Sequence, residues 1–453
     1  MNWFMRLALA AQIAIGSAAA IGLILLGWVL WLVTEPGPMD FARGNAVELG
    51  DYHGGDPTGV PAALAHESLI ERGEYLARAA DCQSCHTAMG GVPFAGGRAF
   101  NLPFGTIYSP NITADKDTGI GGWSDADFLN ALHEGVDDEG ERLYPAMPYA
   151  SFTQMTDADA LAIKAYLFSL APVHAEGMDN KLAFPFNQRW LIGLWNLFFN
   201  PDMRFEPRTD RSAQWNRGAY IAEALAHCGE CHTPRNLAFA LDNRDKFGGA
   251  RISGWRAYNI SGDGPTGVGR WSDAELAAYL STGHARGRGT ASGPMGEAVD
   301  ESFGHLAPGD IAGLVTYLRS VPGISSDLPA TLAGPAPASH REPPGLDPRG
   351  EKLFAGSCAS CHGWTGKSPI WEQATLTGAR AVNDPSADNV AQIVIEGASH
   401  ETAHGTVFMP AFGSALSDDE IAALANYVTG RFGAQGSTIG AKRVAKLRAQ
   451  ASH

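Results

Sequence analysis

Three copies of the pattern Cys-x-x-Cys-His account for every cysteine of this chain, and they span 82–86, 228–232 and 358–362. The pattern is the attachment signature of c-type haem. On one turn of helix, two thiols three positions apart reach the two vinyl groups at one edge of a porphyrin, and the adjacent histidine points its imidazole at the iron. The sequence therefore predicts three covalent haem c groups, attached through Cys82, Cys85, Cys228, Cys231, Cys358 and Cys361.

Other uses of the cysteines fit less well. A disulfide scaffold is short and rich in cysteine, whereas this chain has six cysteines in 453 residues. A structural zinc ion takes two cysteine pairs that converge on it, and three widely separated pairs do not match that pattern. A thioredoxin-like redox pair accounts for one motif but not for three.

Composition argues against nucleic acid as a partner. The 33 basic and 48 acidic residues give a net charge of −15, which opposes binding to a polyanion. Haem is attached covalently outside the cytoplasm, so the motifs predict a bacterial periplasm. The length suggests about three domains, which equals the number of haem motifs.

The N-terminal segment 7–33 contains no charged residue, and Gln12 and Ser17 are its only clearly polar side chains. About 20 residues already span the hydrocarbon core of a bilayer. A cleaved signal peptide has a shorter apolar region that ends at a small-x-small site, whereas this run continues past the candidate site at Ser17. The sequence favours a retained transmembrane anchor. Arg6 before the run and Glu35 after it place the N-terminus inside and the haem domains in the periplasm.

One module is repeated around the three motifs. A helical lead-in to each motif begins at an Arg-Gly pair, at Arg72, Arg217 and Arg349. A second predicted helix closes each module, over 157–170, 309–320 and 418–429, and carries a tyrosine late in its sequence: Tyr166, Tyr317 and Tyr427. Four residues are predicted N-caps: Ser124, Thr156, Ser272 and Ser417.

These signals divide the chain into an anchor, three haem domains and their connectors. The predicted boundaries are an anchor at 1–35, domain I at 60–180, an aromatic-rich connector at 181–208, domain II at 209–322, a Pro/Ala-rich linker at 323–345, domain III at 346–432 and a basic tail at 433–453. The apolar run 190–199 in the first connector is too short to span a membrane. It is either a buried linker or, as we favour, a surface that docks on a partner subunit or on the membrane interface.

The sixth iron ligand decides whether a haem binds small molecules or carries electrons. Met147 and Met295 both lie 24 residues beyond a tryptophan of their module, and Met409 is the only methionine of the third module. The predicted ligand pairs are His86 with Met147, His232 with Met295 and His362 with Met409. The other ring nitrogen of each histidine should donate to a backbone carbonyl. Met155 and Met178 are predicted to fill gaps in the core.

No other residue pattern predicts substrate chemistry. Six further histidines do not recur at equivalent distances in all three modules and are predicted to be packing or surface residues: His133, His174, His284, His305, His400 and His404. The sequence has no dinucleotide-binding or phosphate-binding glycine pattern and no nucleophile elbow, so no catalytic residue is predicted. Arg72, Arg217 and Arg349 either contact haem propionates or serve only as helix-start residues.

The segments Gly121–Ser124, Tyr144–Tyr149 and Cys231–Arg235, together with the anchor and the three modules, resemble the triheme cytochrome c subunits of membrane-bound periplasmic dehydrogenases. This family includes the cytochrome subunits of alcohol, aldehyde, gluconate and fructose dehydrogenases of acetic acid bacteria. The resemblance covers nearly the whole chain after residue 60. It implies an all-α fold of three tandem cytochrome c-type haem domains behind an N-terminal transmembrane helix.

By the same resemblance, a dehydrogenase catalytic subunit supplies electrons and this chain passes them to ubiquinone in the membrane. Membrane lipid and a small iron-sulfur or accessory subunit are further expected partners. A retained anchor favours an aldehyde dehydrogenase, with an alcohol dehydrogenase next, because alcohol-oxidising relatives usually carry a cleaved signal. Two alternatives stay open: a cytochrome c donor to a terminal oxidase, and a self-contained multihaem oxidoreductase with an iron that lacks a methionine ligand.

Overall fold

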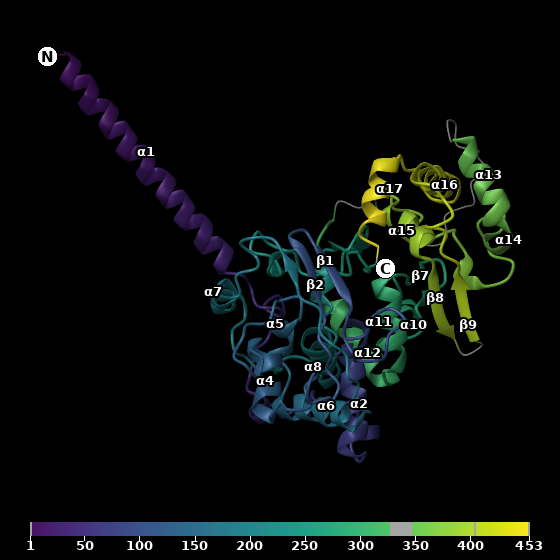
Figure 1. Cartoon of the computed structure of the whole chain (residues 1–453), viewed down its shortest axis with the longest axis horizontal. Helices are drawn as coiled ribbons and strands as arrows, with labels where there is room; N and C mark the ends of the chain where they lie inside the picture. Colours follow the sequence, from purple (N-terminus) through teal and green to yellow (C-terminus); the bar gives the residue numbers. More distant parts are fainter. Residues whose placement is uncertain (1, 327–346, 403–404, 452–453) are drawn as a thin grey trace.

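The computed structural model describes residues 2–326, 347–402 and 405–451. The regions predicted as haem domains I, II and III are called modules one, two and three below. Figure 1 shows modules one and two packed together, module three beside them, and a long N-terminal helix that projects away from the rest. Most of the predicted linker, at 327–345, lies outside the described residues.

Helices form the framework of each module. Module one contains α2 (Leu69–Ala79), α3 (Cys82–Cys85), α4 (Asp125–Glu134), α5 (Tyr149–Phe152) and α6 (Asp157–Ser169). Module two contains α8 (Ala213–Tyr220), the π-turn η3 (Ile221–Leu225), α9 (Gly229–His232), α10 (Asp273–Thr282), α11 (Pro294–Glu301) and α12 (Pro308–Ser320). Module three contains α13 (Pro348–Ser357), α14 (Ala359–His362), α15 (Asp388–Glu396) and α16 (Asp418–Phe432), and α17 (Ala441–Arg448) follows it.

The four predicted N-caps are confirmed. The side chains of Ser124, Thr156, Ser272 and Ser417 each accept a hydrogen bond from the backbone N–H three residues later. Such a bond satisfies one of the amide donors that a helix start leaves without an intrahelical partner. Short 3₁₀ turns complete the helical content: η1 (Leu49–Asp51), η2 (Ala62–Leu64), η4 (Asn243–Asp245), η5 (Phe303–His305) and η6 (Glu372–Ala374).

The expectation of an all-α fold holds only in part, because short antiparallel strands accompany the helices. The pairs are β1 (Ala99–Leu102) with β2 (Gly105–Tyr108), β4 (Ala250–Ile252) with β5 (Trp255–Ala257), β6 (His284–Ala285) with β7 (Gly289–Thr290) and β8 (Ala398–Thr402) with β9 (Gly405–Met409). Strand β3 (Lys181–Leu182) adds to β2. Strands of two to five residues are too short to leave a readable alternation of apolar and polar residues.

Helix α1 (Asn2–Val33) contains a 19-residue apolar stretch, Ile13–Trp31, that is long enough to cross a membrane. None of this stretch is buried against the rest of the chain. The end of the helix is fixed to module two, because the Arg244 guanidinium stacks 4.1 Å from the centre of the Trp31 ring and forms an ion pair with Glu35. The helix therefore leaves the haem modules from a defined point.

A glycine in each lead-in helix allows the first and last helices of its module to cross closely. A Cβ atom at any of these glycines would clash with a backbone oxygen of the closing helix, in the pairs Gly73 with Ala162, Gly218 with Gly313 and Gly350 with Ala423. The crossing helices are α2 with α6, α8 with α12, and α13 with α16. The glycine of the repeated Arg-Gly pair thus has a packing function that its sequence position alone did not indicate.

Modules one and two share one hydrophobic core. Its buried members come from both modules and include Leu76, Ile163, Trp215, Leu225 and Leu314. Module three has a separate core built around Phe354, Ile421 and Leu424. Where the sequence predicts three tandem domains, the structure therefore joins the first two through common apolar packing, which is the dominant favourable contribution to folding.

Two buried tyrosines connect modules one and two reciprocally. Tyr75 of module one donates a 2.6 Å hydrogen bond to Asp310 of α12, and Tyr220 of module two donates a 2.5 Å hydrogen bond to Asp159 of α6. Each hydroxyl also accepts a hydrogen bond from the backbone N–H at the N-cap of the same helix. The tyrosines occupy equal positions of the repeat, so the two modules pack as a pseudo-twofold pair.

Candidate haem-attachment sites

Each cysteine pair lies on or at the start of a short helix. All six cysteines are unpaired thiols. Positions i and i+3 of a helix project from the same face, so both thiols of a motif can reach one edge of a flat group. Burial raises the pKa of Cys82 and of Cys228 to about 12. Burial therefore keeps these two thiols in their neutral form at neutral pH.

The histidine of each motif makes the predicted contact with a backbone carbonyl. His86 Nδ1 lies 2.9 Å from the oxygen of Pro110, His232 Nδ1 lies 2.6 Å from that of Tyr258, and His362 Nδ1 lies 2.6 Å from that of Ala374. Because a carbonyl only accepts hydrogen bonds, Nδ1 carries the proton and Nε2 keeps its lone pair. Burial lowers the pKa of all three imidazoles, which favours the neutral form that binds a metal.

Strand hairpins position these carbonyls in the first two modules. Tyr258 directly follows β5, and Pro110 lies two residues beyond β2. The backbone N–H of Gly249, just before β4, also donates to the carbonyl of His232. In module three the contact comes from the last residue of η6. The strands that sequence reasoning missed therefore orient the predicted iron ligands.

The three predicted methionine ligands are half-buried, and each packs against the same hydrophobic core as the first cysteine of its module. Met147 and Met295 pack against the shared core of modules one and two, as do Cys82 and Cys228. Met409 packs against the core of module three, which includes Cys358. Met155 is fully buried, as predicted for a core residue. The same prediction is wrong for Met178, which is 49% exposed in the extended segment after α6 and has no core to fill.

The alternative histidine ligands within the described residues have protein partners, and His404 lies outside those residues. His284 Nδ1 contacts the Thr290 hydroxyl, His305 contacts the carbonyl of Asp300, and His400 contacts both Asp300 and the carbonyl of Ala291. His133 and His174 lie within 4 Å of carboxylates. Their contacts are those expected of packing or surface histidines.

The repeated arginines differ in their surroundings. The side chain of Arg217 is 13% exposed and forms a 2.7 Å ion pair with Asp310, while Arg349 forms an exposed pair with Asp347. Arg217 thereby holds the carboxylate that also accepts the hydrogen bond of Tyr75 from module one, and Arg349 contacts the N-cap residue of its own helix. The helix-start prediction is confirmed for Arg349, which is the second residue of α13. It is wrong for Arg217, which lies in the last turn of α8.

Each cysteine helix of the first two modules contacts the other module. The α11 side chain Glu301 of module two accepts a 2.6 Å hydrogen bond from Gln83 of α3, and Ser151 of α5 donates to Glu230 of α9. The segment that follows each predicted methionine ligand therefore packs on the cysteine helix of the other module. The pseudo-twofold arrangement brings the first two attachment sites together.

One buried ion pair beside the second motif was not apparent from the sequence. Lys246 Nζ lies 2.6 Å from a carboxylate oxygen of Glu223, and both side chains are 4% exposed. The other carboxylate oxygen accepts a 2.6 Å hydrogen bond from Tyr317. Glu223 lies in the π-turn η3, which accommodates one more residue between Arg217 and Cys228 than separates Arg72 from Cys82. The longer spacing between Arg217 and Cys228 was the sequence signal that could have indicated the π-turn. Such turns often occur at functional sites.

The arrangement suits a covalently attached haem at each motif. The thiols are paired on one helix face, the imidazoles are held through Nδ1, and a thioether lies in the same core. A histidine and a methionine bound to one haem iron would favour electron transfer over the binding of small ligands.

Comparison with known proteins agrees with this geometry. A family model described as cytochrome c matches residues 70–171. One described as cytochrome c oxidase, cbb3-type, subunit III matches residues 346–428. Such domains carry haem c, which identifies the class of cofactor.

Relatives match most of the chain. The fructose dehydrogenase cytochrome subunit of Gluconobacter japonicus is 37% identical over 422 residues, which cover 87% of this chain and 85% of the relative. The gluconate 2-dehydrogenase cytochrome c subunit of Pantoea cypripedii is 37% identical over 402 residues, which cover 85% of this chain and 90% of the relative. A nicotinate dehydrogenase subunit of Pseudomonas putida is 40% identical over 380 residues, but the chain spans only 31% of that protein. From these matches and from the repeated haem motifs, we conclude that the chain belongs to the family of cytochrome c subunits of dehydrogenase complexes.

Proposed function

We propose that this chain carries three haem c groups and relays electrons from a dehydrogenase catalytic subunit to ubiquinone. The observation that carries the proposal is the threefold Cys-x-x-Cys-His motif, with Nδ1 of each histidine held by a carbonyl. Bound haem would supply a one-electron carrier at each site. The chain contributes thioether links from six cysteines and axial ligands from His86, Met147, His232, Met295, His362 and Met409. It contributes no catalytic residue.

The partner is proposed to be the catalytic subunit of an aldehyde dehydrogenase, with an alcohol dehydrogenase next. The long apolar helix α1 supports this order, because a retained anchor departs from the cleaved signal of alcohol-oxidising relatives. A small iron-sulfur or accessory subunit completes the proposed complex. The relatives above are named for fructose, gluconate and nicotinate, and copurification distinguishes such partners from the proposed one.

Membrane attachment is proposed through α1, with the haem modules in the periplasm. Helix α7 (Trp190–Phe199) appears near the end of α1 in Figure 1, and both contact the segment 236–238, where Asn236 donates to Glu35 and Ala238 accepts from Trp195. Its inner face is held by Asn196, which is bonded to Tyr149, and by Trp195, which donates to the Ala238 carbonyl. The residues of its outer face are exposed: Trp190, Leu194, Leu197 and Phe198. We propose that this face rests in the membrane interface, where apolar and aromatic side chains are favoured.

Copurification in mild detergent tests the proposed function. We expect a dehydrogenase subunit to accompany the chain, three haems per chain, and haem reduction only when substrate and this partner are both present. Reduction of the isolated chain by an alcohol, an aldehyde or a sugar would contradict the carrier role. Copurification with a terminal oxidase instead would favour the oxidase-donor alternative, to which the match of 346–428 also points.

Replacing Met147, Met295 or Met409 singly with alanine is expected to remove about one third of the sulfur-to-iron charge-transfer absorption in the near infrared. The physical reason is that each thioether is proposed to bind one iron. The matched control is Met155→Ala, which deletes a buried methionine outside the proposed ligand set and should leave the band unchanged. A ligand assignment is wrong if its variant keeps the full band.

Replacing Trp190, Leu197 and Phe198 together with serine is expected to lower quinone reduction in membranes about tenfold while the haem spectra stay unchanged. Full burial of one such side chain contributes about 1.5–3 kcal/mol of favourable free energy. Partial burial in the membrane interface contributes a fraction of that free energy. Trp195 is not included, because its indole is tied to the inner face. If the triple variant fails to bind haem, the outer face belongs to the core and the membrane role is wrong.

A further inference from the structure

We propose that Arg380 of module three raises the reduction potential of the haem held by module two. The proposal rests on the proposed haem attachment at His232. It extends that proposal because it names a residue outside module two that sets the reduction potential of the haem in module two. Arg380 acts on this haem through its charge and does not itself contact the iron.

The side chain of Arg380 crosses from module three into module two. Its guanidinium donates to the carbonyl oxygen of Asn259 at 3.1 Å and also to that of Thr266. The guanidinium carbon lies 4.7 Å from the centre of the Tyr258 ring, a cation–π contact. The side chain therefore packs on the segment that supports the second haem histidine.

Tyr258 connects this cation to the predicted iron ligand. Its carbonyl oxygen is the partner of His232 Nδ1 at 2.6 Å. The charge of Arg380 thus lies on the Nδ1 side of the imidazole, while Nε2 is the nitrogen left for iron.

The charge of Arg380 is not balanced by a direct ion pair. Within the described part of the chain, no carboxylate lies within salt-bridge distance of it, and its Nε is buried without a hydrogen-bond partner. Burial lowers the pKa of Arg380 to about 10, so it remains protonated at neutral pH.

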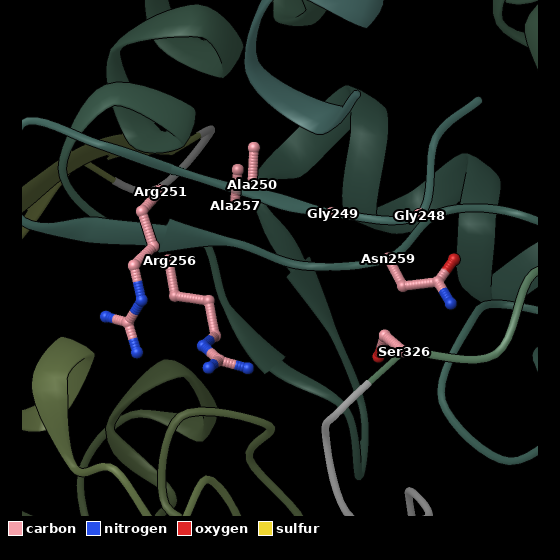
Figure 2. A pocket seen from close by; sticks show the side chains of 8 residues that line it. All are labelled: Gly248, Gly249, Ala250, Arg251, Arg256, Ala257, Asn259 and Ser326. Atoms are coloured by element: carbon pink, nitrogen blue, oxygen red, sulfur yellow. The ribbon is translucent and has the colours of Figure 1, made fainter. Parts of the chain in front are cut away.

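The neighbouring arginines, by contrast, face carboxylates of module three. Figure 2 shows Arg251 and Arg256 pointing to the same side from β4 and β5, along a pocket that also includes Gly249 and Asn259. Arg251 pairs with Asp388, and Arg256 Nε lies 3.6 Å from Asp384. Asp384 also accepts a 3.3 Å hydrogen bond from the Tyr258 hydroxyl. These carboxylates fix module three against module two and hold the segment that carries Arg380 in place.

A fixed positive charge near a haem favours its reduced form. One-electron reduction of the iron from Fe(III) to Fe(II) lowers the charge of the site by one, so a buried cation opposes the oxidised form more strongly. This interaction is larger in a protein interior than in water because the effective dielectric constant is lower. Module three therefore tunes module two toward accepting electrons.

Spectroelectrochemical titration of the purified complex tests the proposal. Arg380→Met is expected to shift the oxidation equilibrium of one of the three haems about tenfold toward the oxidised form, which equals a fall of about 59 mV for a one-electron couple. Arg380→Lys keeps the charge and should restore most of the potential. The control Arg286→Gln removes an arginine whose side chain is 88% exposed and should leave all three potentials unchanged. A Met295→His variant, which alters the spectrum of the second haem, assigns the shifted component.

Three results would overturn the proposal. The first is that Arg380→Met leaves all three reduction potentials unchanged, and the second is that it shifts the potentials of all three haems equally. The third is that Arg380→Lys lowers the potential as much as Arg380→Met does. If Arg380→Met loses haem, Arg380→Gln provides a polar neutral replacement for the same measurement. A haem count below three in the unmodified chain would instead indicate that the proposed function is at fault.

Discussion

Replacing Glu223 with leucine is expected to lower the free energy of unfolding by about 3–5 kcal/mol. Glu223 and Lys246 are both 4% exposed and form a 2.6 Å ion pair. Without the carboxylate, the ammonium group of Lys246 stays buried without its counter-charge, and the Tyr317 hydroxyl loses its acceptor. Denaturant unfolding of the full chain in detergent, followed by circular dichroism, measures the change.

The double variant Glu223→Leu with Lys246→Met is the decisive control. It removes both charges and replaces them with apolar groups, so it should recover most of the lost stability. As a second control, Glu74→Ala breaks the partly exposed pair with Arg78 and should change stability by no more than about 1 kcal/mol. A Glu223→Leu protein as stable as the Glu74→Ala protein would show that the buried pair is not structurally important.

Replacing Gly350 with alanine is expected to destabilise module three by about 3 kcal/mol. The added methyl group would clash with the Ala423 carbonyl and lie 2.8 Å from Cβ of Tyr427. Helices α13 and α16 would have to separate, and the motif that begins at Cys358 directly follows α13. We expect the haem content to fall from three toward two per chain, measured by haem absorbance per mole of protein.

Gly356 provides a matched control within the same helix. Nothing lies within 4 Å of a Cβ atom at that position, so Gly356→Ala adds only the better helix propensity of alanine, worth about 1 kcal/mol. The two variants make the same chemical change six residues apart. Equal effects of both substitutions would show that the close helix crossing does not limit the stability of module three.

Features that depend only on a few consecutive residues could be predicted from the sequence. The N-caps at Ser124, Thr156, Ser272 and Ser417 are confirmed because a cap is a contact between a side chain and the backbone three residues away. The apolar run near the N-terminus forms one long helix for a similar reason. The contact of each motif histidine with a backbone carbonyl followed from the chemistry of imidazole ligands.

Features that depend on distant residues could not be read in this way. The short strands give too little alternation to be detected, and the role of Gly350 becomes apparent only when α16 is seen to cross it. Met178 has a core-like side chain, yet the chain around it runs along the surface. Trp195 and Phe198 are similar in type and three residues apart, but the helix turns the first toward Ala238 and the second outward.

Cysteine and histidine spacing alone indicated three haem sites, because attachment chemistry requires groups within a single helical turn. The pairing of modules one and two, by contrast, depends on Tyr75 meeting Asp310 and on Tyr220 meeting Asp159. The placement of Arg380 behind His232 likewise joins positions more than a hundred residues apart. Such contacts form only when apolar burial brings whole modules together, so tertiary packing decides how the haem sites are arranged and which charges surround them.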